Sequence, residues 1–141
     1  MRFKHSGACH CGAIGVALST DLAAHEIAPR ACGCDFCLKH RPNWFSDRSG
    51  HLTIIHSITP NRYRFGTQTA DFLICPNCGV VVAAVCESDG EALGVFNLNC
   101  LEANHDWSQR AVSVDFDGED TGDRLARRAA NWMPVALKDA D

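Results

Sequence analysis

Seven of the nine cysteines lie in three short groups, and their spacing is the feature of this sequence with the clearest chemistry. The groups are Cys9-His10-Cys11, Cys32-Gly33-Cys34-Asp35-Phe36-Cys37 and Cys75-Pro76-Asn77-Cys78. Thiolates separated by one or two residues can reach the same metal ion, and a glycine after the second cysteine allows the backbone to turn back on the sulfur atoms. The groups therefore predict metal binding by thiolates, with zinc as the expected metal.

The first and last groups each end in a cysteine followed by glycine, and together they supply four ligands. A structural zinc site is a closed tetrahedron, so Cys9, Cys11, Cys75 and Cys78 are predicted to form one site. Structural zinc contributes about 10 kcal/mol or more of binding free energy to folding, and it closes a long loop here. We expect this site to hold the sheet together.

The middle group, Cys32, Cys34 and Cys37, is one ligand short of a closed site. Three protein ligands with an open fourth position are typical of catalytic zinc. A second structural site is the alternative, with its fourth ligand drawn from His10, His40, Cys86 and Cys100. A redox dithiol is a further alternative, although the thioredoxin-like βαβ pattern is absent. The residues by themselves leave these alternatives open.

Composition indicates a globular chain and disfavours nucleic acid as a partner. Of 141 residues, 46% are apolar and 21% are charged, which is close to the average for folded domains. We predict one zinc-binding domain over residues 1–141. Acidic residues outnumber basic ones, 17 to 13, and no basic stripe appears that could neutralise phosphates.

No segment of the sequence predicts secretion or membrane insertion. The first residues lack an apolar stretch, and the longest apolar run, residues 80–86, is far shorter than the roughly 18 residues that cross a bilayer. Disulfides seldom persist in the cytoplasm, and nine cysteines cannot all pair. A soluble cytoplasmic protein without a membrane partner is therefore expected, while its oligomeric state stays unknown.

Short strand-like runs dominate the rest of the chain and predict a mainly β fold of short antiparallel strands. We expect about seven to nine strands, among them residues 14–18, 52–55, 63–65, 71–74, 80–85, 94–98 and 112–116. One C-terminal helical segment is predicted over residues 123–132, with Leu125, Ala129 and Trp132 on its buried face and Thr121 as its cap. A minor helical turn is expected after Cys37.

Several residues near the cysteine groups have a structural and a functional interpretation. The basic run at residues 39–41 could receive substrate carboxylates, although such runs are more typical of a solvated turn. Trp44 and Phe45 are more typical of the core than of a pocket wall. Cys86 and Cys100 each end an apolar strand, which predicts small buried side chains. His105 is more typical of a surface loop than of a catalytic base.

The three cysteine blocks, residues 6–14, 32–37 and 75–79, resemble the signature blocks of the glutathione-dependent formaldehyde-activating enzyme family in order and in spacing. The resemblance implies a zinc-bound, Mss4-like β-tent. It assigns Cys9, Cys11, Cys75 and Cys78 to a structural zinc, and it assigns Cys32, Cys34 and Cys37 to a catalytic zinc. Two zinc ions per chain are therefore expected.

The resemblance also implies an activity: the addition of glutathione to formaldehyde, as in an S-hydroxymethylglutathione synthase, which is classed as a carbon-sulfur lyase. Zinc with an open position can bind the incoming thiol as thiolate or polarise the aldehyde oxygen. A glutathione-like thiol and a small aldehyde are the implied partners. The alternative is a non-catalytic zinc-binding module for a protein or small ligand.

Two departures from the family pattern bear on the substrate. Asp35 stands where many members have serine, and residues 71–74 lack the arginine often found before the last cysteine block. A carboxylate beside the thiolates and the loss of a cation both predict weaker binding of an anionic substrate.

Overall fold

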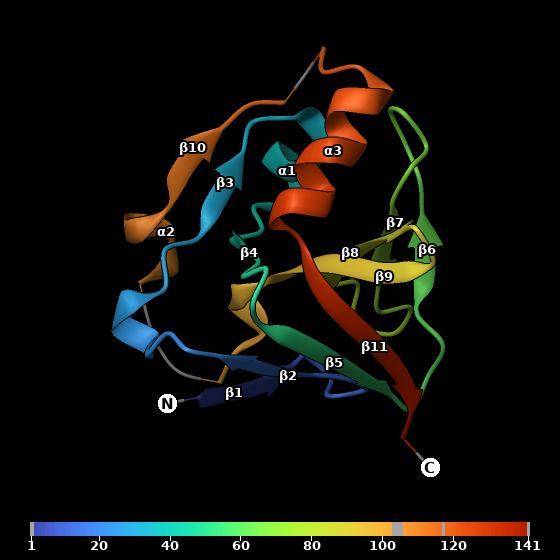
Figure 1. Ribbon diagram of the computed structural model, residues 1–141. Coiled ribbons are helices and arrows are strands. Elements are labelled where there is room, and N and C mark those ends of the chain that lie inside the picture. Colours follow the sequence, from blue (N-terminus) through green and yellow to red (C-terminus); the bar gives the residue numbers. More distant parts are fainter. Residues whose placement is uncertain (1, 103–105, 117, 141) are drawn as a thin grey trace.

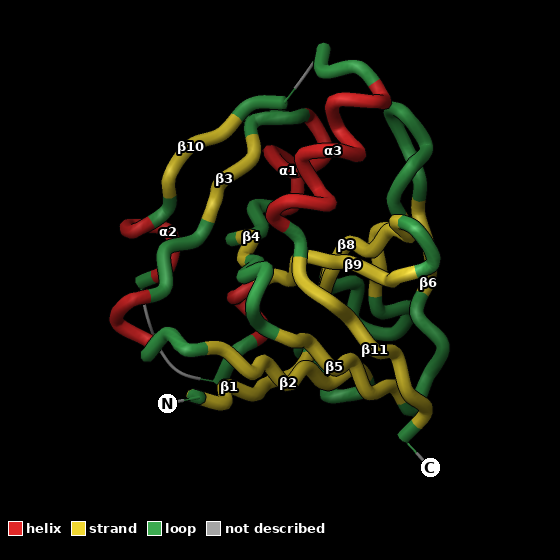
Figure 2. Tube along the Cα trace, viewed as in Figure 1, coloured by secondary structure: helices red, strands yellow, loops and turns green. Residues whose placement is uncertain are grey.

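Strands are the most frequent element of the described chain, which comprises residues 2–102, 106–116 and 118–140 of this computed structural model. Within these residues the fold is mainly β, with eleven strands and a C-terminal helix (Figures 1 and 2). The strands are β1 (Phe3–Ala8), β2 (Ile14–Thr20), β3 (Arg30–Cys32), β4 (Trp44–Phe45), β5 (His51–His56), β6 (Asn61–Tyr63), β7 (Asp71–Ile74), β8 (Val81–Ser88), β9 (Glu91–Asn97), β10 (Val112–Val114) and β11 (Met133–Asp139). The helices are α1 (Asp35–His40), α2 (Trp107–Arg110) and α3 (Thr121–Asn131), with 3-10 turns η1 (Ala24–Glu26) and η2 (Leu98–Cys100).

The first wing of the sheet has the strand order β1-β2-β5-β11 and lies at the bottom of Figure 1. β1 and β2 form an antiparallel hairpin from Phe3↔Thr20 to Ala8↔Gly15, and β2 pairs antiparallel with β5. Apolar residues alternate along β2 and are buried. Because one face of this wing packs on the core, the period-two pattern of the sequence located β2 and β5 correctly.

The second wing is the antiparallel series β6-β7-β8-β9, and β11 connects it to the first wing. β8 pairs with the whole of one edge of β9. On the other edge of β9, β11 pairs with Leu93 and Gly94, while β4 pairs with Phe96 and Asn97. Residues 81–86 are all buried, as the continuous apolar run predicts for a strand covered on both faces.

The count of strands was too low because four strands give weak local signals. β1 alternates half-buried with exposed residues and carries few apolar side chains. β3 and β4 contain only three and two residues. β11 includes Pro134, which is unusual inside a strand. It pairs in parallel with the distant β5, so no hairpin turn in the sequence indicates it. β6 ends at Tyr63, which leaves residues 64 and 65 of the predicted run outside it.

The predicted C-terminal helix is confirmed and Trp132 is buried, but Leu125 and the cap differ from the prediction. Asp120 is the N-cap, and its side chain accepts a hydrogen bond of 2.8 Å from the Asp123 N–H, so Thr121 is the first helical residue. Leu125 is 36% exposed, whereas Arg128 is 6% exposed. The helix turns arginines inward because it borders a cavity, described below, instead of packing on the main core.

Two apolar clusters form the core. The larger lies between the wings around the fully buried Phe96, Ile54 and Leu18. The smaller contains Trp44, Val95 and Trp132, and the cysteines of the middle group pack against it. None of the helices described is both long and apolar enough to cross a membrane.

Candidate metal centres

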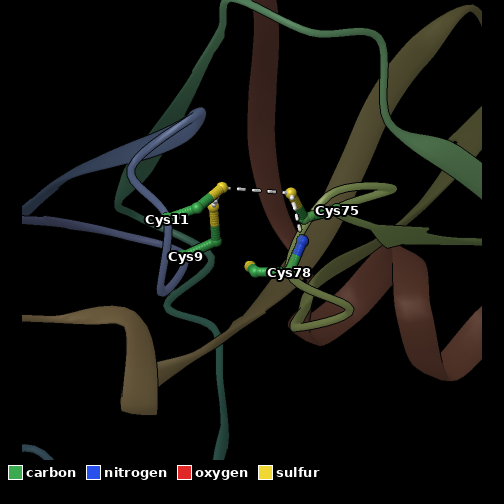
Figure 3. A group of neighbouring side chains, drawn as sticks. All are labelled: Cys9, Cys11, Cys75 and Cys78. Atoms are coloured by element: carbon green, nitrogen blue, oxygen red, sulfur yellow. Dashed lines mark hydrogen bonds between the residues drawn. The ribbon is translucent and has the colours of Figure 1, made fainter.

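Two hairpin turns bring the first and last cysteine pairs together. Cys9 and Cys11 lie in the turn between β1 and β2, and Cys75 and Cys78 lie in the turn between β7 and β8. The four sulfur atoms all lie within 4.8 Å of one another, and Figure 3 shows them converging from the two turns. The predicted grouping of these four thiols is therefore confirmed, and it joins the two wings of the sheet.

A glycine shapes each of the two turns. Gly12 has φ 85° and Gly79 has φ 81°, a backbone region that side chains with a Cβ rarely adopt. Their N–H groups donate to the carbonyl oxygens of Cys9 and Cys75, at 3.0 and 2.9 Å. The turns differ in length by one residue, but in both a left-handed glycine lets the backbone turn back, so the predicted role of glycine after the second cysteine is confirmed.

The spacing of the sulfur atoms fits a tetrahedral metal ion. The Cys9 and Cys11 sulfurs are 3.7 Å apart, and those of Cys11 and Cys75 are 3.6 Å apart. A tetrahedron with metal–sulfur bonds of about 2.3 Å has edges of about 3.8 Å, whereas a disulfide bond is about 2.05 Å long. The thiols are free and arranged for coordination.

The electrostatics of this group also favour a bound cation. Burial, and then the neighbouring thiols, raise the pKa of Cys9 to about 11, although the Ile14 N–H donates to its sulfur at 3.3 Å. Neighbouring thiolates repel one another, so several thiols this close together do not all ionise by themselves. A bound divalent cation offsets this repulsion, and a thiol that coordinates it is deprotonated. The four residues therefore could hold one metal ion.

The middle group forms a second cluster at the start of α1. Cys32 is the last residue of β3, Cys34 is the N-cap of α1, and Cys37 lies in its first turns. The three sulfur atoms lie within 4.8 Å of one another. α1 begins at Asp35, two residues before Cys37, whereas the helical turn was expected after Cys37. This cysteine triad is the second group that could hold a metal ion.

Hydrogen bonds orient two of the triad sulfurs. The Cys37 N–H donates to the Cys34 Sγ at 3.4 Å, and the Trp44 indole N–H donates to the Cys37 Sγ at 3.3 Å. Hydrogen bonding with Cys32, and then burial, raise the pKa of Cys37 well above its ordinary value. As in the first group, a cation is what allows these thiols to ionise together.

The fourth ligands named for the alternative, a second structural site, do not join the triad. Within the described part of the chain, no further His, Cys, Asp or Glu belongs to this cluster, and His10, His40, Cys86 and Cys100 all lie outside it. Cys86 and Cys100 are buried, as predicted, and burial raises the pKa of Cys100 to about 12. The Asp35 carboxylate accepts a hydrogen bond of 2.8 Å from the Phe36 N–H.

The triad lines a cavity of about 620 Å³, a size typical of small-molecule sites. Trp44 is both buried in the core and part of the cavity wall, whereas Phe45 belongs to the core alone. Aromatic rings from α1, β6, β7 and the segment between these two strands form one side of the cavity: Phe36, Tyr63, Phe65 and Phe72. The open face of the triad therefore has room for an organic ligand.

The basic run at residues 39–41 is exposed, as a solvated turn predicts. Lys39 reaches the cavity rim, while the His40 ring lies 4.4 Å from the Phe36 ring. Arg41 ends α1 with a left-handed backbone, φ 57°. His105 lies outside the described residues.

Sequence reasoning missed the basic side of the cavity. Four arginines line it: Arg30 from β3, and Arg124, Arg127 and Arg128 from α3. The sequence did contain a signal, because the three α3 arginines recur at a spacing that places them on one face of a helix. The expectation of a disfavoured anion considered only Asp35 and the segment 71–74.

The indole N–H of Trp44 supports a prediction about the triad. Trp44→Phe keeps an aromatic side chain but removes the hydrogen bond to Cys37. Groups that orient a ligand are worth about 10- to 100-fold in metal affinity, so we expect zinc at the triad to bind about 10-fold more weakly. Chelator competition on the second zinc equivalent measures this. Trp107→Phe, the same change on α2, is the control, and an unchanged affinity in Trp44→Phe would contradict the role given to the indole.

Comparison with known proteins supports the fold. No family model matches the chain. A crystal structure of a Rhodobacter sphaeroides protein, determined as a structural genomics target, is similar, with 27% sequence identity and a TM-score of 0.59. The match covers 77% of this chain and 97% of that one.

Proposed function

We propose that this protein is a zinc enzyme of the glutathione-dependent formaldehyde-activating type. It adds glutathione, or a related thiol, to formaldehyde or another small aldehyde. The observation that carries the proposal is the cysteine triad: three thiols that could hold a metal, with no fourth ligand among the described residues, at a cavity of about 620 Å³. An incomplete ligand set beside a cavity is the arrangement expected of catalytic zinc.

The two cysteine groups have different roles in this proposal. Cys9, Cys11, Cys75 and Cys78 hold a structural zinc that fixes the two wings, while Cys32, Cys34 and Cys37 hold the catalytic zinc. All-sulfur donor sets of this size suit zinc. A bound zinc ion supplies Lewis acidity, which favours the ionised form of a thiol and polarises a carbonyl oxygen.

The reaction needs no oxidant and no protein nucleophile. A carbon–sulfur bond forms, the carbon–oxygen π bond of the aldehyde breaks, and the thiol proton ends on the new hydroxyl group. The protein positions the reactants: Trp44 orients the Cys37 sulfur, and the aromatic side of the cavity limits the access of water. The proposed activity is thus that of a carbon-sulfur lyase acting in the direction of addition.

The competing proposal is a non-catalytic zinc module that binds a protein or a small ligand. It requires the second site to be closed by a fourth protein ligand. The described residues supply no such ligand at the triad. The enzyme proposal is therefore the better supported of the two.

Exchange spectroscopy on glutathione and formaldehyde tests the proposed activity. We expect the zinc-loaded protein to accelerate the exchange about 10-fold or more over the uncatalysed rate, because a metal stabilises the charge that develops during addition. Free zinc at the same concentration is the first control, and protein treated with a chelator under non-denaturing conditions is the second. The absence of acceleration with several thiols and several aldehydes would remove the proposal.

A further inference from the structure

The cavity beside the cysteine triad has a basic side as well as an aromatic one. The lining residues described include five cations, Arg30, Lys39, Arg124, Arg127 and Arg128, and two carboxylates, Asp35 and Glu119. Outside the metal-binding thiols, the lining therefore carries an excess of positive charge. Such an excess concentrates anions in a cavity with low-dielectric walls.

Glu119 forms ion pairs with two of the arginines, although Arg124 Nε makes no hydrogen bond. It accepts from Arg127 through Nε and Nη2 at 3.1 Å, and Arg124 Nε lies 3.3 Å from the same carboxylate. Arg127 is fixed further by stacking, with its guanidinium 3.6 Å from the centre of the Phe116 ring. These contacts hold the arginines of the basic side in place. Among the described lining residues Glu119 is the only carboxylate near α3, and Arg124 and Arg127 already occupy it.

Arg128 is buried without a carboxylate partner among the described residues. It is 6% exposed, donates from Nη1 to Thr69 Oγ1 at 2.7 Å, and lies 4.7 Å from the centre of the Trp132 ring. Its Nε is also buried and makes no hydrogen bond. Burying a guanidinium in this state is costly unless an anion approaches it.

Arg30 is the second cation of the cavity without a carboxylate partner in the described chain. It is half-buried and donates from Nη2 to Ser46 Oγ at 2.6 Å. Arg127 lines the same cavity, so the two guanidinium charges share it. Two arginines that face like charges inside one cavity would both be stabilised by a negatively charged ligand.

The opposite side of the cavity selects for an apolar ligand body. The rings of Phe36, Phe65 and Phe72 lie 4.8 Å from one another, and Tyr63 stacks 5.7 Å from Phe65. Such a surface gains free energy by covering apolar groups. An apolar ligand body therefore suits this side of the cavity.

We propose that the cavity binds a small apolar compound bearing an oxyanion, either a carboxylate or a phosphate. The oxyanion lies on the arginine side, and the apolar body lies against Phe36, Phe65 and Phe72. The orientation of the ligand alone rests on the proposed function: its thiol or aldehyde group faces the cysteine triad. The substrate class is thus an apolar organic anion.

Calorimetric titration of the zinc-loaded protein tests the proposal without turnover. The probes are 3-phenylpropanoate, phenethyl phosphate and the neutral 3-phenylpropan-1-ol, which share an apolar body. Charge-assisted hydrogen bonds to arginine are worth about 10-fold or more in affinity, so we expect the alcohol to bind about 10-fold more weakly than the tighter anion. That tighter anion identifies the oxyanion as carboxylate or phosphate.

Two arginine variants and a matched control locate the anion. We expect Arg30→Met or Arg128→Met to weaken anion binding about 10-fold while changing alcohol binding little. Arg62→Met, which removes an exposed arginine paired with Asp71 outside the cavity, leaves anion binding unchanged. Arg128 is buried, so its variant is first checked for folding by circular dichroism, and Arg30→Met decides the question if it does not fold.

Four outcomes would overturn the anion site: no binding of either anion at millimolar concentration, equal affinity for anion and alcohol, equal weakening in Arg62→Met, or unchanged anion affinity in the two arginine variants. The proposed activity fails separately. Arginine-dependent binding without thiol–aldehyde exchange would remove the proposed function and keep the site. Thiol–aldehyde exchange without arginine-dependent binding would keep the proposed function and remove the anion site.

Discussion

Cys75→Ser is expected to abolish the cooperative fold. Cys75 is 1% exposed, and its sulfur lies 3.6 Å from that of Cys11 in the other hairpin turn. Serine is a poor zinc ligand, so the variant loses the connection between the β1–β2 turn and the β7–β8 turn. We expect less than one equivalent of zinc at this group and no cooperative unfolding transition in urea.

The expected size of this effect follows from the margin of stability. Domains are stable by about 5–15 kcal/mol, and structural zinc contributes about 10 kcal/mol or more at neutral pH. Losing the metal therefore removes most or all of the free energy of unfolding. Circular dichroism through a urea titration, with zinc per chain measured on the same sample, gives both quantities.

Cys86→Ala is the matched control for this variant. Cys86 is a buried cysteine outside both metal-binding groups, so its loss leaves only a small cavity. We expect the control to keep two zinc ions and to lose about 1 kcal/mol of stability. If Cys75→Ser and Cys34→Ser unfold the protein equally, the division into a structural and a catalytic site is wrong.

The first cysteine group, which could hold a metal ion, was predictable because its information is local. Each of its two turns carries its own cysteine pair and its own glycine, and the left-handed backbone of Gly12 and Gly79 is what the pattern requires. The pairing of the turns followed from the need for four ligands. The two turns are far apart in sequence, but this did not hinder the prediction. The number of ligands that a closed site needs indicated which turns meet, without any knowledge of strand pairing.

The strands were predictable only where burial imposes a pattern. β2 has one face on the core and β8 is covered on both, so alternation and a continuous apolar run located them. β11 gives neither signal. Its place is set by parallel pairing with β5 and by contact with β9, both distant in sequence, and periodicity cannot detect such pairings.

The basic side of the cavity was missed because a hydrophobic criterion was applied to α3. That criterion chose Leu125 for the buried face, yet the helix covers a cavity whose other side is aromatic. Arg128 can be buried there because Thr69 and Trp132 contact its guanidinium. A helix that borders a ligand cavity need not bury its most apolar residues. The apolar pattern of α3 therefore failed to indicate both the helix face that turns inward and the arginines that line the cavity.

Cys34→Ser is expected to leave the protein folded and to remove its activity. Cys34 is the N-cap of α1 and accepts the Cys37 N–H, and serine is a favoured N-cap residue that preserves this contact. The triad lies on a short helix and its flanking strand and does not bridge the two wings. The substitution therefore removes a zinc ligand while it conserves local structure.

Three measurements check this expectation. Zinc per chain falls from two to one, and the accelerated glutathione–formaldehyde exchange is lost. The free energy of unfolding, measured by urea titration, falls by no more than about 1–2 kcal/mol. Cys100→Ala, another buried cysteine outside the triad, is the control and keeps both zinc ions and the exchange. Because the arginine side of the cavity is intact in Cys34→Ser, we expect 3-phenylpropanoate and phenethyl phosphate still to bind. Retained exchange with one zinc per chain would show that the triad is not the catalytic centre.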